Sequence, residues 1–192
     1  MNAALRAFGV LVDPPGEWAK IAEEPDDPAL LMIRYTALLA IIPAVCGFLG
    51  ACVIGSIVPG AGAVRAPFFY SALGTVFGYL ECLALVVLLA LIVNIGAPLF
   101  TGRRNFAGAL KVAAYAFTPL WLAGIFLLLP GLRFLMLTGF YGVYILAAGL
   151  PRMMNAPAGK TPGFTALVVV LVCALIFIAA SAEHALFGIP LP

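Results

Sequence analysis

The sequence predicts an all-α integral membrane protein, a bundle of five transmembrane helices. Of its 192 residues, 65% are hydrophobic and only 9% are charged. The apolar residues gather in five blocks, and each block can supply the roughly 18 or more residues that cross about 30 Å of hydrocarbon. The blocks are Thr36–Val58, Phe68–Phe100, Val112–Leu129, Leu132–Leu150 and Phe164–Ala182. A soluble domain of this length could not bury so much apolar surface.

The rest of the chain divides into short polar segments. We expect residues 1–34 to form a cytoplasmic or interfacial segment, 35–182 the membrane domain and 183–192 a short extracytoplasmic tail. Six acidic residues lie in the first 27 positions, where a secretory signal would have a basic start and an apolar run. The first block is therefore expected to be an uncleaved anchor, and no soluble catalytic domain is expected.

The positive charges predict an orientation. Eight of the ten Lys and Arg residues fall in the N-terminal segment, between blocks two and three, or between blocks four and five. Only Arg65 and Arg133 fall on the opposite side. The positive-inside rule places the N-terminus in the cytoplasm and, with five spans, the C-terminus outside. We expect the protein to reside in the cytoplasmic (inner) membrane.

The N-terminal segment contains two short helical patterns. Residues 2–12 place Leu5, Phe8 and Val12 on one side, and a second pattern follows with Trp18 on its apolar face. Tryptophan prefers the headgroup zone, where its ring is apolar and its N–H stays wet. This favours a segment on the cytoplasmic membrane surface with Trp18 in contact with lipid. A disordered leader is the alternative.

Proline and glycine indicate where helices start, bend and reverse. Asp27 followed by Pro28 is a typical helix start, so the helix of the first span is expected to begin there. Pro119 lies inside the third block and predicts a kink. Pro130 and Gly131 alone separate blocks three and four, which predicts two adjacent antiparallel helices joined by a tight turn.

Small residues recur every four positions in the first two blocks. Gly47, Ala51 and Gly55 form one stripe, and Gly74 and Gly78 form another. In lipid such stripes let helix backbones approach closely, so we expect them to pack against other helices. The second block is also long: as a helix its 33 residues would reach about 50 Å. It must tilt or project beyond the bilayer.

Several runs resemble a known family in their order and spacing. They are Ala40–Gly50, Tyr115–Leu120, Leu129-Pro130, Tyr141–Leu146 and Gly149–Pro151, preceded by Pro14 and Trp18 in a Pro-x-x-x-Trp pattern. Together they resemble the short bacterial inner-membrane branch of the Yip family, named for Ypt/Rab-interacting proteins. The resemblance implies a five-helix fold with a cytoplasmic N-terminus. Eukaryotic members are associated with Rab GTPases and carry a longer N-terminal region, so a bacterial-type member is expected to have no Rab partner.

A carboxylate inside the second block is the sharpest candidate site. Glu81 lies near the middle of that block, on the same side as Gly74, where a charge is costly. Tyr141 is expected at a comparable depth, so we predict a hydrogen bond between Glu81 and Tyr141 or another hydroxyl. We expect Glu81 to be often protonated, because burial disfavours the charged form. It is either a proton or cation site or, more typically, a structural hydrogen bond.

Two further groups are candidate sites. Lys111, Tyr115 and Thr118 share one face of the third span, as a small polar cleft open to the cytoplasm or as side chains that reach the interface. Arg103 and Arg104, with Lys111 and Trp18, are candidates for binding an anionic lipid headgroup or an acidic protein surface. Anchoring the positive side of the membrane domain is the alternative purpose of the two arginines.

No pattern indicates catalysis or a metal site. His184 is the only histidine, which excludes a multi-histidine metal site and leaves no Ser/His/Asp set in reach. No glycine-rich phosphate loop occurs between a strand and a helix. The four cysteines all lie within apolar blocks without C-x-x-C spacing, as small packing residues: Cys46, Cys52, Cys82 and Cys173. We expect no enzyme, no cofactor and no metal.

These observations predict a non-enzymatic scaffold or adaptor that binds membrane lipids or other membrane proteins. No nucleic-acid partner is expected, and self-association is an open option. The alternative is a small-solute or ion transporter or channel that uses Glu81 and the kinked third span. No internal repeat is evident, so an inverted-repeat carrier is not supported.

Overall fold

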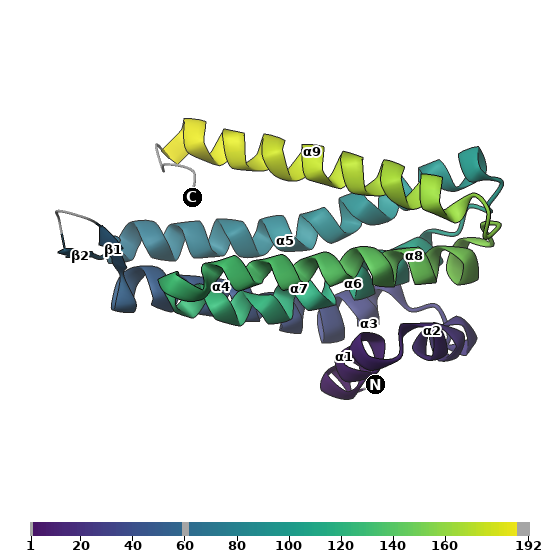
Figure 1. Ribbon diagram of the computed structural model, residues 1–192, viewed down its shortest axis with the longest axis horizontal. Helices are drawn as coiled ribbons and strands as arrows, with labels where there is room; N and C mark the ends of the chain where they lie inside the picture. Colours follow the sequence, from purple (N-terminus) through teal and green to yellow (C-terminus); the bar gives the residue numbers. More distant parts are fainter. Residues whose placement is uncertain (1, 59–61, 188–192) are drawn as a thin grey trace.

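Five helical segments, each long and apolar enough to cross a membrane, form the bundle of the computed structural model (Figure 1). The structure describes residues 2–58 and 62–187. The five segments are Pro28–Ile54, Phe68–Phe100, Phe106–Leu128, Pro130–Met154 and Thr161–Ser181. The predicted all-α membrane fold with five spans is confirmed. Large apolar side chains remain exposed along the outer helices, as a lipid-facing surface requires.

Two short helices precede the first span. Helix α1 covers Ala3–Val12 and α2 covers Pro14–Glu23. The Asp13 side chain accepts a hydrogen bond from the Gly16 N–H at 3.1 Å, which caps the start of α2. Both helices pack beside the bundle near one of its ends (Figure 1), so the N-terminal segment is helical rather than a disordered leader.

The first span is helical from Pro28, as the Asp27-Pro28 pair predicts. The Asp27 carboxylate accepts from the Leu30 N–H at 2.9 Å. The helical segments that follow are α3 (Pro28–Leu31), a π-helical turn (Met32–Thr36), α4 (Ala37–Leu49) and a second π-helical turn (Gly50–Ile54). The helix ends earlier than the predicted Val58, because Gly55 takes φ 76°, a conformation that favours glycine.

A small antiparallel hairpin joins the first two spans. Strand β1 (Ser56–Val58) pairs with β2 (Gly62–Val64), with Ser56 opposite Val64. Helix α5 (Phe68–Gly96) follows, and a 3₁₀ turn (Ala97–Phe100) completes the long second span. Figure 1 shows α5 running along most of the long axis of the bundle.

The third span is the centre of the bundle. Its helices are α6 (Phe106–Ala116) and α7 (Thr118–Ala123), followed by a 3₁₀ segment (Gly124–Leu128). The interruption at Phe117 lies beside Pro119, where the kink is predicted. In its most apolar window 72% of the residues are buried, against 17–28% in the other four spans.

The last two spans lie beside this central helix. A turn at Leu129 reverses the chain into a 3₁₀ segment (Pro130–Phe140) and α8 (Tyr141–Met154). Helix α9 (Thr161–Phe187) packs against α5 and α8. Residues 183–187 of the predicted tail continue α9, and 188–192 lie outside the described residues.

The small-residue stripes face one another without close contact. Gly47 and Ala51 line one side of a groove of about 320 Å³, and Gly74 and Gly78 line the other. A Cβ atom added at Gly74 or Gly78 would meet nothing within 4 Å. The expected close packing of these two glycines against another helix is therefore wrong for this chain, and the missing side chains leave a groove instead.

Candidate functional site

Trp18 fixes α2 to the bundle. Its side chain is fully buried, and its Nε1–H donates to the Ile145 carbonyl oxygen of α8 at 3.1 Å. One turn further along α8, a Cβ at Gly149 would lie 2.5 Å from Cζ2 of the indole. The predicted lipid contact of Trp18 is therefore wrong. The indole is held inside the protein because α8 provides both an acceptor and the space for the ring.

Two tyrosines extend this contact into the core. The Tyr115 ring packs edge-on against Trp18, with 5.7 Å between ring centroids, and against Tyr35 at 4.8 Å. The Tyr35 and Thr118 hydroxyl oxygens lie 2.7 Å apart in a buried hydrogen bond. Aromatic packing and one hydroxyl pair thus join α2, the first span and the third span.

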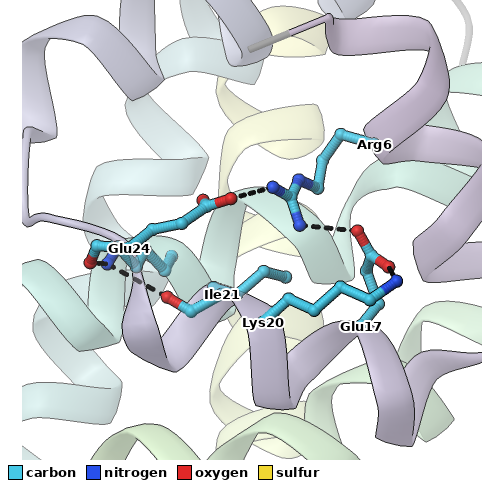
Figure 2. Close-up of polar contacts among 6 residues, drawn as sticks. Arg6, Glu17, Lys20, Ile21 and Glu24 are labelled. Carbon is cyan, nitrogen blue, oxygen red and sulfur yellow. Dashed lines mark hydrogen bonds and ion pairs between the residues drawn. The ribbon is translucent and has the colours of Figure 1, made fainter.

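A group of ion pairs joins α1 to α2, and Figure 2 shows its members. The Arg6 guanidinium bonds through one nitrogen to Glu17 Oε1 at 2.5 Å and through the other to Glu24 Oε1. Lys20 Nζ contacts the second oxygen of Glu17 at 3.0 Å. The Arg6 and Glu17 side chains are each only 11% exposed, so their pairing is shielded from water far more than a surface salt bridge.

Lys111 of α6 binds the end of α2. Its ammonium donates to Asp26 Oδ1 at 2.7 Å and to the Glu24 and Ile21 carbonyl oxygens at 2.9 and 3.4 Å. These contacts use the three N–H donors of the ammonium. Lys111 is buried. The prediction that it reaches the interface or a lipid headgroup is therefore wrong, because the protein's own N-terminal segment satisfies it.

A cavity of about 860 Å³ lies beside this ion cluster. Charged side chains of both signs line it, including Arg6, Glu17, Lys20 and Lys111, and Tyr115 lies at its inner wall. Two members of the predicted polar cleft, Lys111 and Tyr115, thus share one cavity. The third, Thr118, lies elsewhere in the core against Tyr35.

Tyr141 has a hydrogen-bond partner in α1. The Tyr141 hydroxyl donates to the Leu11 carbonyl oxygen at 3.0 Å, so its proton points to α1 and not to the Glu81 carboxylate. The last carbonyls of a helix have no partner within it, which makes Leu11 a ready acceptor. Glu81 lies half-buried in the middle of α5. A bond in which Tyr141 accepts from a protonated Glu81 stays a prediction.

The two connections at the same end carry exposed cations. We call this end the basic end, and its basic surface consists of Arg103, Arg104, Arg152 and Lys160, all exposed. The Arg103 N–H donates to the Met154 carbonyl oxygen at 2.8 Å, which ties the two connections together. Residues 97–105 and 151–161 contain no acidic residue. Of these four cations, only the adjacent pair Arg103 and Arg104 is predicted from the sequence to bind a ligand.

Sequence reasoning missed the partners of the ion cluster. In the sequence Arg6, Glu17 and Glu24 are only charges of a predicted surface segment, and no pattern singles out Tyr35. One signal was present: Glu17 and Glu24 are seven residues apart, which places two carboxylates on one side of a helical segment. A single arginine can bind both.

The fold and its docked N-terminal segment define a polytopic helical membrane protein. The Yip1 domain model matches residues 8–180, so the chain belongs to the Yip1 domain family. The predicted resemblance is confirmed. Inner membrane protein YohC of Escherichia coli K12 is 27% identical over 152 residues, which cover 77% of this chain and 78% of that protein. The same protein of Escherichia coli O6:H1 strain CFT073 matches equally. No solved structure matches the chain.

Proposed function

We propose that this protein is a non-enzymatic scaffold of the inner membrane that binds other membrane proteins or lipids through its basic surface. The observation that carries the proposal is a difference between two groups of cations at the basic end. One group is paired within the protein, and the other is exposed. Arg6 and Lys111 are paired with carboxylates of the N-terminal segment. The four cations of the basic surface stand exposed on connections without acidic residues.

Such a surface suits an anionic partner. The guanidinium groups of Arg103 and Arg104 offer forked donors that match a carboxylate or phosphate, and hydrogen bonds to ionised groups are about twice as strong as neutral ones. By the positive-inside rule, this end is expected to face the cytoplasm. The relative from Escherichia coli is named an inner membrane protein. The expected ligands are therefore acidic cytoplasmic segments of membrane proteins or anionic headgroups.

The packing of the third span favours binding over transport. Tyr115 and Thr118, which a transport path along the kink would need, are buried in ring and hydroxyl contacts with Tyr35. In the part of the chain that the structure describes, these contacts hold the first and third spans together. The docked N-terminal segment also gives the basic end a fixed shape, which a binding surface requires.

Co-purification tests the proposal. The tagged protein would be isolated from native membranes in mild detergent, and the masses of all retained molecules measured. We expect a stoichiometric partner that the double variant Arg103→Gln/Arg104→Gln retains at least tenfold less, because each lost charged hydrogen bond costs about 1.5–3 kcal/mol. The matched control is Arg65→Gln/Arg133→Gln, which removes two exposed arginines at the opposite end.

Two results would contradict the scaffold proposal. One is equal retention of every bound molecule by both double variants. The other is proton or solute flux in liposomes that Glu81→Gln abolishes, which would make transport the function.

A further inference from the structure

A second feature begins at the basic surface, a groove between α8 and α9. Its volume is about 610 Å³. The walls are small or apolar side chains: Val143, Ala147 and Pro151 on α8, and Thr165, Ala166 and Val169 on α9. Ala158 and Thr161 close the end at the connection between the two helices. The groove is thus an apolar depression on the side of the bundle, and it begins at the connection that carries Arg152 and Lys160.

The length of the groove matches one leaflet of a bilayer. Val143 and Pro151 are eight residues apart, so the α8 wall extends about 12 Å. Half of a typical hydrocarbon core is about 15 Å. A transmembrane helix of a partner protein would contact α8 and α9 over both leaflets. A groove limited to one leaflet fits an acyl chain of a lipid that belongs to that leaflet.

Two exposed cations neighbour the residues at one end of the groove. Arg152 follows Pro151 directly, and Lys160 directly precedes Thr161, so both exposed cations adjoin residues that line the groove. No acidic residue occurs in 151–161 to neutralise them. A chain that enters the groove would therefore place its headgroup near these two exposed cations.

We propose that the groove binds an anionic glycerophospholipid of the leaflet at the basic end. One acyl chain lies between α8 and α9, and the phosphate lies beside Arg152 and Lys160. The inference rests on the proposed function and deepens it, because it names the lipid class and a site for it separate from Arg103 and Arg104.

Native mass spectrometry tests the lipid site. The intact protein in detergent would be titrated with phosphatidylglycerol or with phosphatidylcholine of the same acyl chains. We expect one tightly bound phosphatidylglycerol and much weaker phosphatidylcholine. Ala147→Phe, which fills the groove, should lower phosphatidylglycerol binding at least tenfold. Val170→Phe is the matched control, since Val170 is 64% exposed on α9 and does not line the groove.

A further double variant tests the headgroup contact. Arg152→Gln/Lys160→Gln should lower binding roughly twenty-five-fold, from about fivefold for each cation. If Ala147→Phe does not fold, as its melting temperature would reveal, the result for Arg152→Gln/Lys160→Gln decides.

The proposal is overturned by equal binding of the two lipids, or by equal binding to a folded Ala147→Phe variant and the Val170→Phe control. It is also overturned if a protein segment occupies the groove in cross-linking from α8. The Arg103→Gln/Arg104→Gln variant should keep its phosphatidylglycerol while losing a protein partner. A failure of the lipid site is thus distinguishable from a failure of the scaffold proposal.

Discussion

Gly149 shows how much one residue decides at the basic end. The Trp18 ring lies so close to its Cα that a methyl group would have to displace the indole. The side chain of Trp18 is the link between α2 and α8, and its hydrogen bond to Ile145 holds the ring in one orientation. The absence of a single methyl at residue 149 thus allows the N-terminal segment to dock.

We expect Gly149→Ala to destabilise the protein by about 1–3 kcal/mol, because overpacking forces neighbouring side chains from their preferred positions. The loss should appear as a lower melting temperature in detergent. Gly78→Ala is the control, since it is also a helical glycine but has open space at its Cβ. A Gly149→Ala variant as stable as Gly78→Ala would show that Trp18 does not need this space.

Residue-scale predictions from the sequence failed where two environments suit the same side chain. Trp18 and Lys111 each combine an apolar body with a polar end, which suits a membrane interface as well as a protein core. Lipid and protein offer the same apolar surroundings, so composition alone cannot distinguish them. What decides is an acceptor from a distant segment, Ile145 for Trp18 and Asp26 for Lys111.

At the scale of elements, helix α1 has one exposed apolar side and one side that is buried against the protein. Leu5, Phe8 and Val12 are 65–70% exposed, and this apolar side was predicted to lie along the membrane. Ala7 and Val10 are buried against the protein. The helical pattern predicts that these three residues share one exposed side, and contact of that side with the membrane stays a prediction. It cannot predict the protein-facing side, whose contacts depend on how α2 folds back.

We expect Arg6→Met to weaken the docking of α1 by about 1–3 kcal/mol, because Glu17 and Glu24 lose their shared partner while still partly buried. Hydrogen exchange of the α1 amides should speed up roughly five- to 150-fold. Lys20→Met serves as the control: its side chain is 71% exposed, and such a pair contributes at most about 1 kcal/mol. Equal exchange in both variants would contradict a docking role for Arg6.

At the scale of the whole molecule, hydrophobicity and proline placement predicted most of the fold. The five spans, the early helix start at Pro28 and the break beside Pro119 follow from local chain properties. The central position of the third span did not follow. Its apolar window has a mean hydropathy of 1.5, but that of the fourth span is 1.6 although only 28% of it is buried, so hydropathy does not identify the central helix.

The orientation of the bundle is open to a direct test. Gly159→Cys places a thiol in the connection at the basic end, and Gly131→Cys places one in the turn between spans three and four, both without steric conflict. We expect a membrane-impermeant maleimide to label Gly131→Cys in intact spheroplasts and Gly159→Cys only in inverted vesicles. The parent protein, with its four cysteines, measures the background. The reverse labelling pattern would overturn the positive-inside assignment.

The hydrogen bond between Trp18 and Ile145 has a consequence for biosynthesis. Its partners are 127 residues apart in the chain, so α2 leaves the ribosome long before its acceptor exists. At about 5–20 residues per second, the delay is roughly 6–25 s. During that time the first spans are made while Arg6, Glu17 and Glu24 have only one another, Lys20 and water as partners. Docking of the N-terminal segment is thus a late step of folding, and an intact indole contact reports that four of the five spans have been assembled.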